Sequence, residues 1–129
     1  MELTRYEALH AYARMLNTSN ADILEPLLAE DFVYESQMVF SALKSKEAYL
    51  DYIRAKLWAI QRDGATAFAE MGEIDAYGEL QPCVVLAQHT RENLGGFVIA
   101  RVDADKISRL DLCIVPFPHT AKRSGEYPA

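Results

Sequence analysis

The 129-residue sequence has no long apolar run, and its acidic residues outnumber its basic ones by 19 to 13. A helix that spans a bilayer needs about 20 apolar residues in succession, so we expect no membrane partner. A formal charge of −6 leaves no basic patch that could bind nucleic acid. The first residues contain acids and no apolar signal-peptide core, which indicates a cytoplasmic protein.

Cysteine is scarce, and the motifs of common cofactor sites are missing from the sequence. Cys83 and Cys113 lack the close spacing of a redox or zinc motif. In a cytoplasmic protein they are expected to be buried, reduced thiols. The sequence also lacks a glycine-rich phosphate loop, a metal-spaced histidine pair and a nucleophile elbow. We therefore expect no cofactor and no bound metal.

What the sequence does contain is helical periodicity in two segments. Apolar residues recur at helical spacing over residues 3–16 and 46–62. Thr4 and Glu7 form the pattern of a capping box, and Ser45 precedes the second segment as an N-cap. These features predict two long helices, each with one apolar face.

A shorter helix and a first strand are predicted between the two long helices. Residues 21–29 have a helical pattern, although Pro26 should bend or shorten that helix. Residues 32–36 alternate in polarity and favour β-structure. Residues 37–40 are a candidate for a short returning strand.

The chain after Gly64 has the alternating patterns and turn residues of a strand meander. The expected strands are residues 65–76, 82–90, 97–102 and 106–115. Three prolines mark residues 116–129 as an irregular C-terminal tail, which leaves residues 1–115 as a single domain. Helices followed by a meander indicate an α+β fold. A twisted sheet of this length curls, and a long helix across its concave face leaves room for a pocket.

Short motifs spread over residues 12–115 carry a resemblance to a known group. They are Tyr12-x-x-x-Leu16-Asn17, Asp22, Leu27-Leu28-Ala29-Glu30-Asp31, Tyr34-Glu35, Ser45-Lys46-Glu47-Ala48-Tyr49 and Lys106-Ile107. With this pattern the sequence resembles the NTF2-like superfamily, which includes ketosteroid isomerases, scytalone dehydratase and SnoaL-type polyketide cyclases. The resemblance implies an NTF2-like (cystatin-like) cone, with three N-terminal helices packed on the concave face of a curved antiparallel sheet. Because the superfamily contains enzymes, carriers and association modules, the fold does not define the function.

The ketosteroid isomerases offer a test of activity, residue by residue. Tyr12 matches the tyrosine that donates a hydrogen bond to the developing oxyanion in those enzymes. Ser36 stands where they have the aspartate that acts as general base, and Val98 stands where they have a protonated aspartate. A serine hydroxyl cannot abstract a carbon-bound proton near neutral pH without a base of its own. The resemblance therefore does not extend to steroid isomerase activity.

The leading hypothesis is binding of a small apolar or aromatic molecule inside the cone. Side chains alternate along a strand, so Phe32, Tyr34 and Ser36 share one face, and in the resembled fold that face meets the cavity. Together with Tyr12 they would form an apolar pocket with a few hydroxyl groups, although the same residues also suit a well-satisfied core. The predicted ligand-binding residues are Tyr12, Phe32, Tyr34, Ser36, Tyr52, Val98, Leu110 and Leu112.

The first alternative is a SnoaL-like or dehydratase-like isomerase or lyase. Scytalone dehydratase-like chemistry pairs a histidine with tyrosines, which makes Tyr12 and His89 the candidate catalytic residues here. Histidine is the side chain that most often acts as general acid or base near neutral pH, which makes His89 a candidate for this role. It also precedes a turn at residues 90–93, however, where a solvated histidine is common.

The second alternative is an association module that binds no ligand. If Leu110 and Leu112 face the cavity, then Arg109 and Asp111 lie on the convex face of the sheet. The side chain of Glu35 is also expected on the convex face, because it alternates with that of Ser36. We expect a homodimer through this convex face, with a contact between Arg109 and Asp111 across a two-fold axis.

Overall fold

The computed structural model describes residues 2–39 and 41–129, and its two long helices begin where the capping signals predict. Helix α1 is Arg5–Thr18 and helix α2 is Lys46–Arg62. The Thr4 hydroxyl accepts from the Glu7 N–H, and the Glu7 carboxylate accepts from the Thr4 N–H, which completes the capping box. The Ser45 hydroxyl accepts from a backbone N–H at the start of α2. Both helix predictions are confirmed.

The third predicted helix, over residues 21–29, is not an α-helix. The chain forms two short 3₁₀ turns, η1 (Ala21–Ile23) and η2 (Glu25–Leu27), and then enters strand β1 (Leu28–Ser36). Pro26 explains the difference, because its ring blocks the interior of an α-helix and suits the first turn of a new element. Strand β1 therefore begins four residues before its predicted start.

The predicted returning strand at residues 37–40 is not formed by the residues that are described. Residues 37–39 form a turn and a bend, and residue 40 lies outside the described residues. The chain does return to β1, but through a single antiparallel bridge between Tyr34 and Leu43.

The sheet has six strands in the order β1-β5-β4-β3-β2-β6. After β1 these are β2 (Ala67–Ala76), β3 (Glu79–Gln88), β4 (Leu94–Asp103), β5 (Lys106–Cys113) and β6 (Lys122–Arg123). Neighbouring strands are antiparallel except β1 and β5, which run parallel. The sheet is therefore mixed, and the expectation of a purely antiparallel sheet is corrected. A crossover that contains α2 separates β1 from the meander, so β1 can lie beside the last long strand in the same direction.

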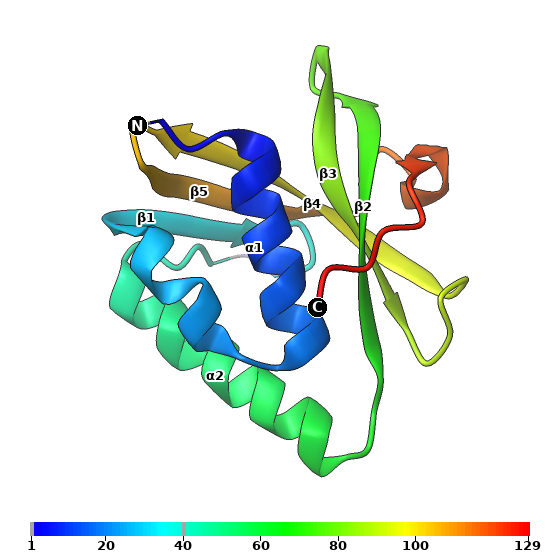
Figure 1. Ribbon diagram of the computed structural model, residues 1–129, viewed down its shortest axis with the longest axis horizontal. Coiled ribbons are helices and arrows are strands. Elements are labelled where there is room, and N and C mark those ends of the chain that lie inside the picture. Colours follow the sequence, from blue (N-terminus) through cyan, green and yellow to red (C-terminus); the bar gives the residue numbers. More distant parts are fainter. Residues whose placement is uncertain (1, 40) are drawn as a thin grey trace.

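The curvature of the sheet creates the interior of the cone. In Figure 1 the β2–β3 hairpin runs across the direction of β1 and β5, while α1 and α2 lie together on one side of the sheet. The main core lies between these helices and the sheet. A smaller core forms on the opposite side, where both cysteines lie buried and unpaired on β3 and β5, with β4 between them.

The C-terminal segment is more ordered than the predicted irregular tail. Residues Pro118–Thr120 form the 3₁₀ turn η3, and β6 then pairs with β2. Strand β2 would otherwise be an edge strand with unpaired backbone groups. The segment satisfies some of them, since the Met71 N–H donates to the Glu126 carbonyl at 2.9 Å. This pairing explains why a proline-rich segment is held against the sheet.

Candidate functional site

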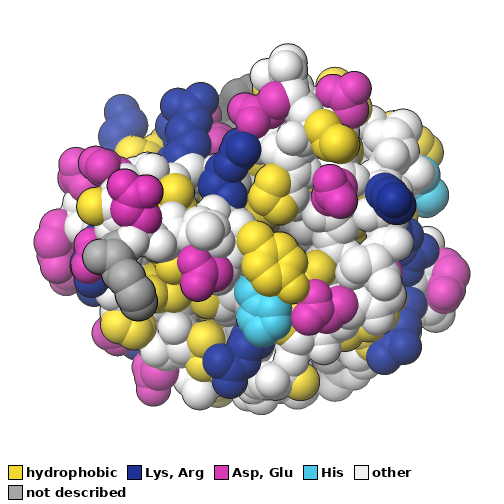
Figure 2. All heavy atoms as spheres, turned by 45° about the horizontal axis from the view of Figure 1, so that its top comes forward, with side chains coloured by type: hydrophobic (Ala, Val, Ile, Leu, Met, Phe, Trp, Pro, Cys, Tyr) yellow, Lys and Arg dark blue, Asp and Glu magenta, His cyan; other side chains and the backbone are white. Residues whose placement is uncertain are grey.

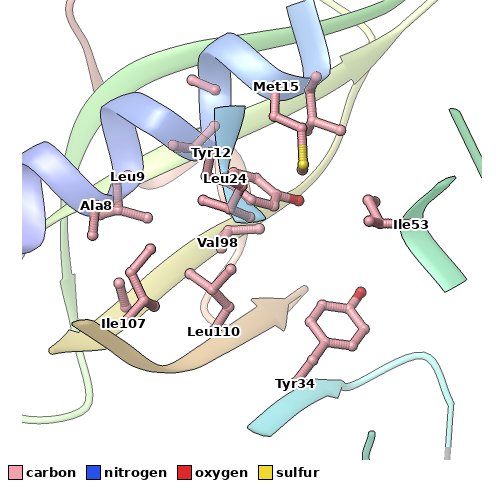
Figure 3. Close-up of a cluster of buried hydrophobic side chains, with 14 of the residues drawn as sticks. Ala8, Leu9, Tyr12, Met15, Leu24, Tyr34, Ile53, Val98, Ile107 and Leu110 are labelled. Carbon is pink, nitrogen blue, oxygen red and sulfur yellow. The ribbon is translucent and has the colours of Figure 1, made fainter. Parts of the chain in front are cut away.

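Four tyrosine side chains meet between α1, α2 and β1. Tyr12 comes from α1, Tyr34 from β1, and Tyr49 and Tyr52 from α2. The ring centroids of Tyr34 and Tyr49 are 5.2 Å apart, and those of Tyr34 and Tyr52 are 5.6 Å apart. In Figure 3 the Tyr12 and Tyr34 hydroxyl groups both point into the interior between the helices and the sheet. The inward direction predicted for Tyr12 and Tyr34 is therefore confirmed.

Strand register places the remaining predicted residues around this cluster. Tyr34 pairs with Leu110, and Ser36 pairs with Leu112, which in turn pairs with Val98 on β4. These apolar side chains and Phe32 belong to the same buried core as Tyr12 and Tyr34. The structure thus brings the predicted apolar residues together with Tyr12 and Tyr34, with Tyr52 at the rim, where it is 38 % exposed, whereas Ser36 and Leu112 also line a hollow on the opposite face of the sheet.

Tyr49 is the site residue that the sequence analysis missed. It is fully buried, and its hydroxyl is the one buried side-chain polar atom without a hydrogen-bond partner among residues 2–39 and 41–129. Leaving such a group unpaired costs about 1–3 kcal/mol. The sequence pattern that could have identified Tyr49 is its position on the apolar face of α2, because a tyrosine there brings a hydroxyl group into an apolar core.

The electrostatics of the cluster favour neutral hydroxyl groups. Burial raises the pKa of Tyr12 well above 10, and the nearby Tyr52 adds to this effect. Burial also raises the pKa values of Tyr34 and Tyr49, and the neighbouring tyrosines contribute in both cases. Among residues 2–39 and 41–129 the buried polar residues are Ser36, Glu70 and Gln81, and the Glu70 carboxylate is bound by Arg123. The cluster can therefore donate hydrogen bonds to an oxygen atom, but it holds no general base.

His89 does not join the tyrosines. Strand β3 ends at Gln88, and His89 lies exposed in the turn that follows, with a left-handed backbone φ of 71°. Its backbone N–H donates to the Thr66 carbonyl at 2.9 Å. The predicted catalytic pair of Tyr12 and His89 is therefore not assembled, because the turn directs this histidine into solvent.

The opposite face of the sheet carries charged groups, as the alternation of side chains predicted. The Arg109 guanidinium contacts the Asp111 carboxylate at 2.9 Å and the Glu35 carboxylate at 2.8 Å. Hydrogen bonds to Asp111 and then Glu35 raise the pKa of Arg109. The Arg109–Asp111 contact forms within one chain, and the expected contact across a two-fold axis stays a prediction. These residues line a hollow of about 900 Å³ on this face, which Ser36 and Leu112 also reach.

Residues 2–39 and 41–129 contain no group of three or more potential metal ligands. No helix in the same part of the chain has the length and hydropathy to cross a bilayer. On the face shown in Figure 2, acidic and basic side chains are mixed with apolar ones and form no continuous basic surface.

Comparisons with known proteins found similar solved structures, but no match by family or by sequence. No known protein family matched the chain, and no curated protein matched its sequence. An NTF2-like protein of unknown function from Cytophaga hutchinsonii has a TM-score of 0.61 at 13 % identity, with 92 % of this chain and 96 % of that chain covered. A protein proposed to be a polyketide cyclase from Sinorhizobium meliloti has a TM-score of 0.58 at 15 % sequence identity, with 83 % of this chain and 94 % of that chain covered.

An LEH-like epoxide hydrolase from M. tuberculosis also gives a TM-score of 0.58, at 18 % identity, with 84 % of this chain and 76 % of that chain covered. Identities this low establish the fold and nothing about chemistry. The chain has the NTF2-like, cystatin-like fold that the sequence motifs implied.

The raised tyrosine pKa values lead to a titration test. The sequence has seven tyrosines; with Tyr12, Tyr34 and Tyr49 protected, we expect four (7 − 3) to ionise while the protein is folded. Above about pH 10 the unfolded chain releases protons that the folded protein retains, so stability falls by about 1.4 kcal/mol per pH unit for each protected tyrosine. Tyrosinate absorbance and circular dichroism, recorded together, check both points. Ionisation of all seven tyrosines before unfolding would contradict the buried cluster.

Proposed function

We propose that this protein of NTF2-like fold binds a small apolar or aromatic molecule inside the cone, at the cluster of Tyr12, Tyr34, Tyr49 and Tyr52. The observation that carries the proposal is the buried Tyr49 hydroxyl without a partner. Folded proteins satisfy nearly all buried polar groups, and a ligand oxygen would satisfy this one. A purely structural core would have no need of a hydroxyl there.

The lining of the site favours an uncharged ligand with an aromatic body and an acceptor oxygen. Aromatic and aliphatic side chains surround the hydroxyl groups, and the Phe32 and Tyr49 rings pack edge to face at 5.0 Å. A charged ligand would be buried here without an opposite charge, which is costly. A ketone, phenol or ether oxygen can accept from the protonated tyrosines.

A ligand would enter between α2 and the end of β1. Tyr52 lies at this rim, half-exposed, with its ring close to that of Tyr34. Met38 and Val39 are exposed in the turn directly after β1. Apolar side chains around an entrance suit the passage of an apolar molecule.

Binding is better supported than catalysis. The general-base position of the resembled isomerases holds Ser36, whose hydroxyl accepts from the Met38 N–H at 3.1 Å. His89, the base that a lyase or isomerase would need, is in solvent. The names of two similar structures, a proposed polyketide cyclase and an epoxide hydrolase, support a site for an organic molecule of this kind. The two unpaired, buried cysteines support a reducing, cytoplasmic location.

Replacing Tyr49 by phenylalanine separates ligand binding from structural packing. In the ligand-free protein, Tyr49→Phe should raise the free energy of unfolding by about 1 kcal/mol, because it removes an unpaired buried hydroxyl. For neutral aromatic ketones and naphthols, the same change should weaken binding about tenfold, the loss of one hydrogen bond. Denaturant unfolding with and without ligand measures both effects; wild-type protein at about 100 times the dissociation constant should gain about 2.7 kcal/mol.

Tyr77→Phe is the matched control for this experiment. The Tyr77 hydroxyl donates to the Val115 carbonyl, outside the cluster, so this variant should bind the same compounds with unchanged affinity. The proposal fails if no compound stabilises the wild-type protein, or if Tyr49→Phe destabilises the ligand-free protein as the loss of a made hydrogen bond would.

We also propose that a second copy of the chain binds to the outer face of the sheet. The distribution of exposed apolar side chains favours this arrangement. Tyr77, Val115 and Phe117 are exposed by 58 %, 65 % and 61 %, respectively. The Tyr77 hydroxyl contacts the Val115 backbone, so the tip of the β2–β3 hairpin lies beside the segment that follows β5. Contiguous apolar surface of this kind is characteristic of interfaces. A homodimer would cover it together with the hollow beside Arg109.

Sedimentation equilibrium tests the dimer. Wild-type protein should sediment as a dimer, and Val115→Asp should raise its dissociation constant about 100-fold, because a charge would enter the centre of the contact. Trp58→Asp, at a 61 % exposed position of α2 on the opposite side of the sheet, should leave the mass unchanged. A monomeric wild-type protein would contradict the proposal.

A further inference from the structure

The segment from Lys122 to Pro128, hereafter the strap, lies along the outer edge of β2 (the red trace in Figure 1). Its first two residues are β6, and Arg123 pairs with Gly72 of β2. The Ser124 N–H donates to the Met71 carbonyl at 3.1 Å, and the Met71 N–H donates to the strap at Glu126. The strap thus adds an extended chain to the sheet through main-chain hydrogen bonds.

One buried carboxylate of β2 serves the strap alone. Glu70 is 4 % exposed, and its Oε1 accepts from Arg123 Nε at 2.6 Å. Its Oε2 accepts from the Gly125 N–H at 2.8 Å. Gly125 has a φ of 81°, a left-handed conformation that glycine adopts most readily. The Glu70 carboxylate therefore selects an arginine and, two residues later, a glycine.

The edge of β2 is also shaped for a closely packed strand. A Cβ atom on Gly72 would lie 2.8 Å from the Lys122 carbonyl oxygen, whereas its other neighbours would be at ordinary contact distances of 3.4 Å or more. Gly72 thus permits the close approach of the strap, and only the strap would be displaced by a larger residue at this position.

Few apolar contacts hold the strap in place. Its residues 122–126 are exposed, and Pro128 is its one buried residue. The Arg91 guanidinium covers the Tyr127 ring at 4.2 Å, and Asn17 Nδ2 donates to the Pro128 carbonyl at 2.8 Å. The Tyr6 hydroxyl also donates to the Glu126 carboxylate at 2.8 Å, and the Tyr127 and Phe68 rings meet edge to face at 6.4 Å.

We propose that the β2 edge from Glu70 to Glu73 is a binding site for an extended peptide that carries arginine and, two residues later, glycine, and that the strap occupies this site in cis. The partner is a segment of another protein that pairs with β2 by strand addition, with its arginine on the Glu70 carboxylate. The site lies on the edge of the sheet and does not depend on the tyrosine cluster.

The test uses the full-length protein and a fluorescein-labelled peptide of residues 122–129, KRSGEYPA. The tethered strap competes at an effective concentration in the millimolar range, so binding of the peptide to wild-type protein should be weak. Arg123→Ala loosens the tethered strap and leaves Glu70 and Gly72 intact. This variant should bind the peptide at least about tenfold more tightly than wild type, measured by fluorescence anisotropy.

Two controls make the outcome decisive. Gly72→Ala added to Arg123→Ala should abolish binding, because the edge then rejects any strand, and a peptide with alanine in place of its arginine should not bind to Arg123→Ala. Melting followed by circular dichroism confirms that each variant is folded. The proposal is overturned if folded Arg123→Ala does not bind the peptide, or if the Gly72→Ala double variant binds it equally well.

Discussion

The parallel pairing of β1 with β5 is the constraint on which the rest of the structure depends. It joins the first strand of the chain to the last long strand of the meander, with Tyr34 beside Leu110 and Ser36 beside Leu112. Because side chains alternate along a strand, a shift of this register by one residue would exchange the two faces of β1. The tyrosine cluster and the ion pairs of the outer face both require this one register. The helices then cover the inner face and bury it.

The same alternation divides the molecule into two regions with different chemistry. Tyr34 and Leu110 point into a core of aromatic and aliphatic side chains, while Glu35 and Arg109, their neighbours in the sequence, form ion pairs on the other side. The inner region holds hydroxyl groups that burial keeps protonated. The outer region holds the Arg109 guanidinium, which is paired with the Glu35 and Asp111 carboxylates. We therefore place the proposed ligand in the first region and the proposed second copy of the chain on the second.

Much of this could be predicted from local sequence, and the remainder depended on contacts distant in sequence. Capping residues and periodicity gave both long helices, and strand alternation gave the inward direction of Tyr34. The parallel placement of β1 could not be predicted, because no local pattern specifies which strand will be its neighbour. The strap depends on the edge of β2, some 50 residues earlier in the chain, and the missing partner of Tyr49 appears only once the whole core is assembled. His89 was misassigned because its strand ends at Gln88, two residues before its predicted end.

The central claim is that the Tyr49 hydroxyl is unpaired because it belongs to a ligand site, and electron density tests this most directly. The decisive measurement is a high-resolution crystal structure of protein purified without added compounds. We expect non-protein density from a trapped organic molecule, with an acceptor atom about 3 Å from the Tyr49 hydroxyl oxygen. A hydroxyl bonded to a neighbouring protein group, in a core with no such density, would contradict it.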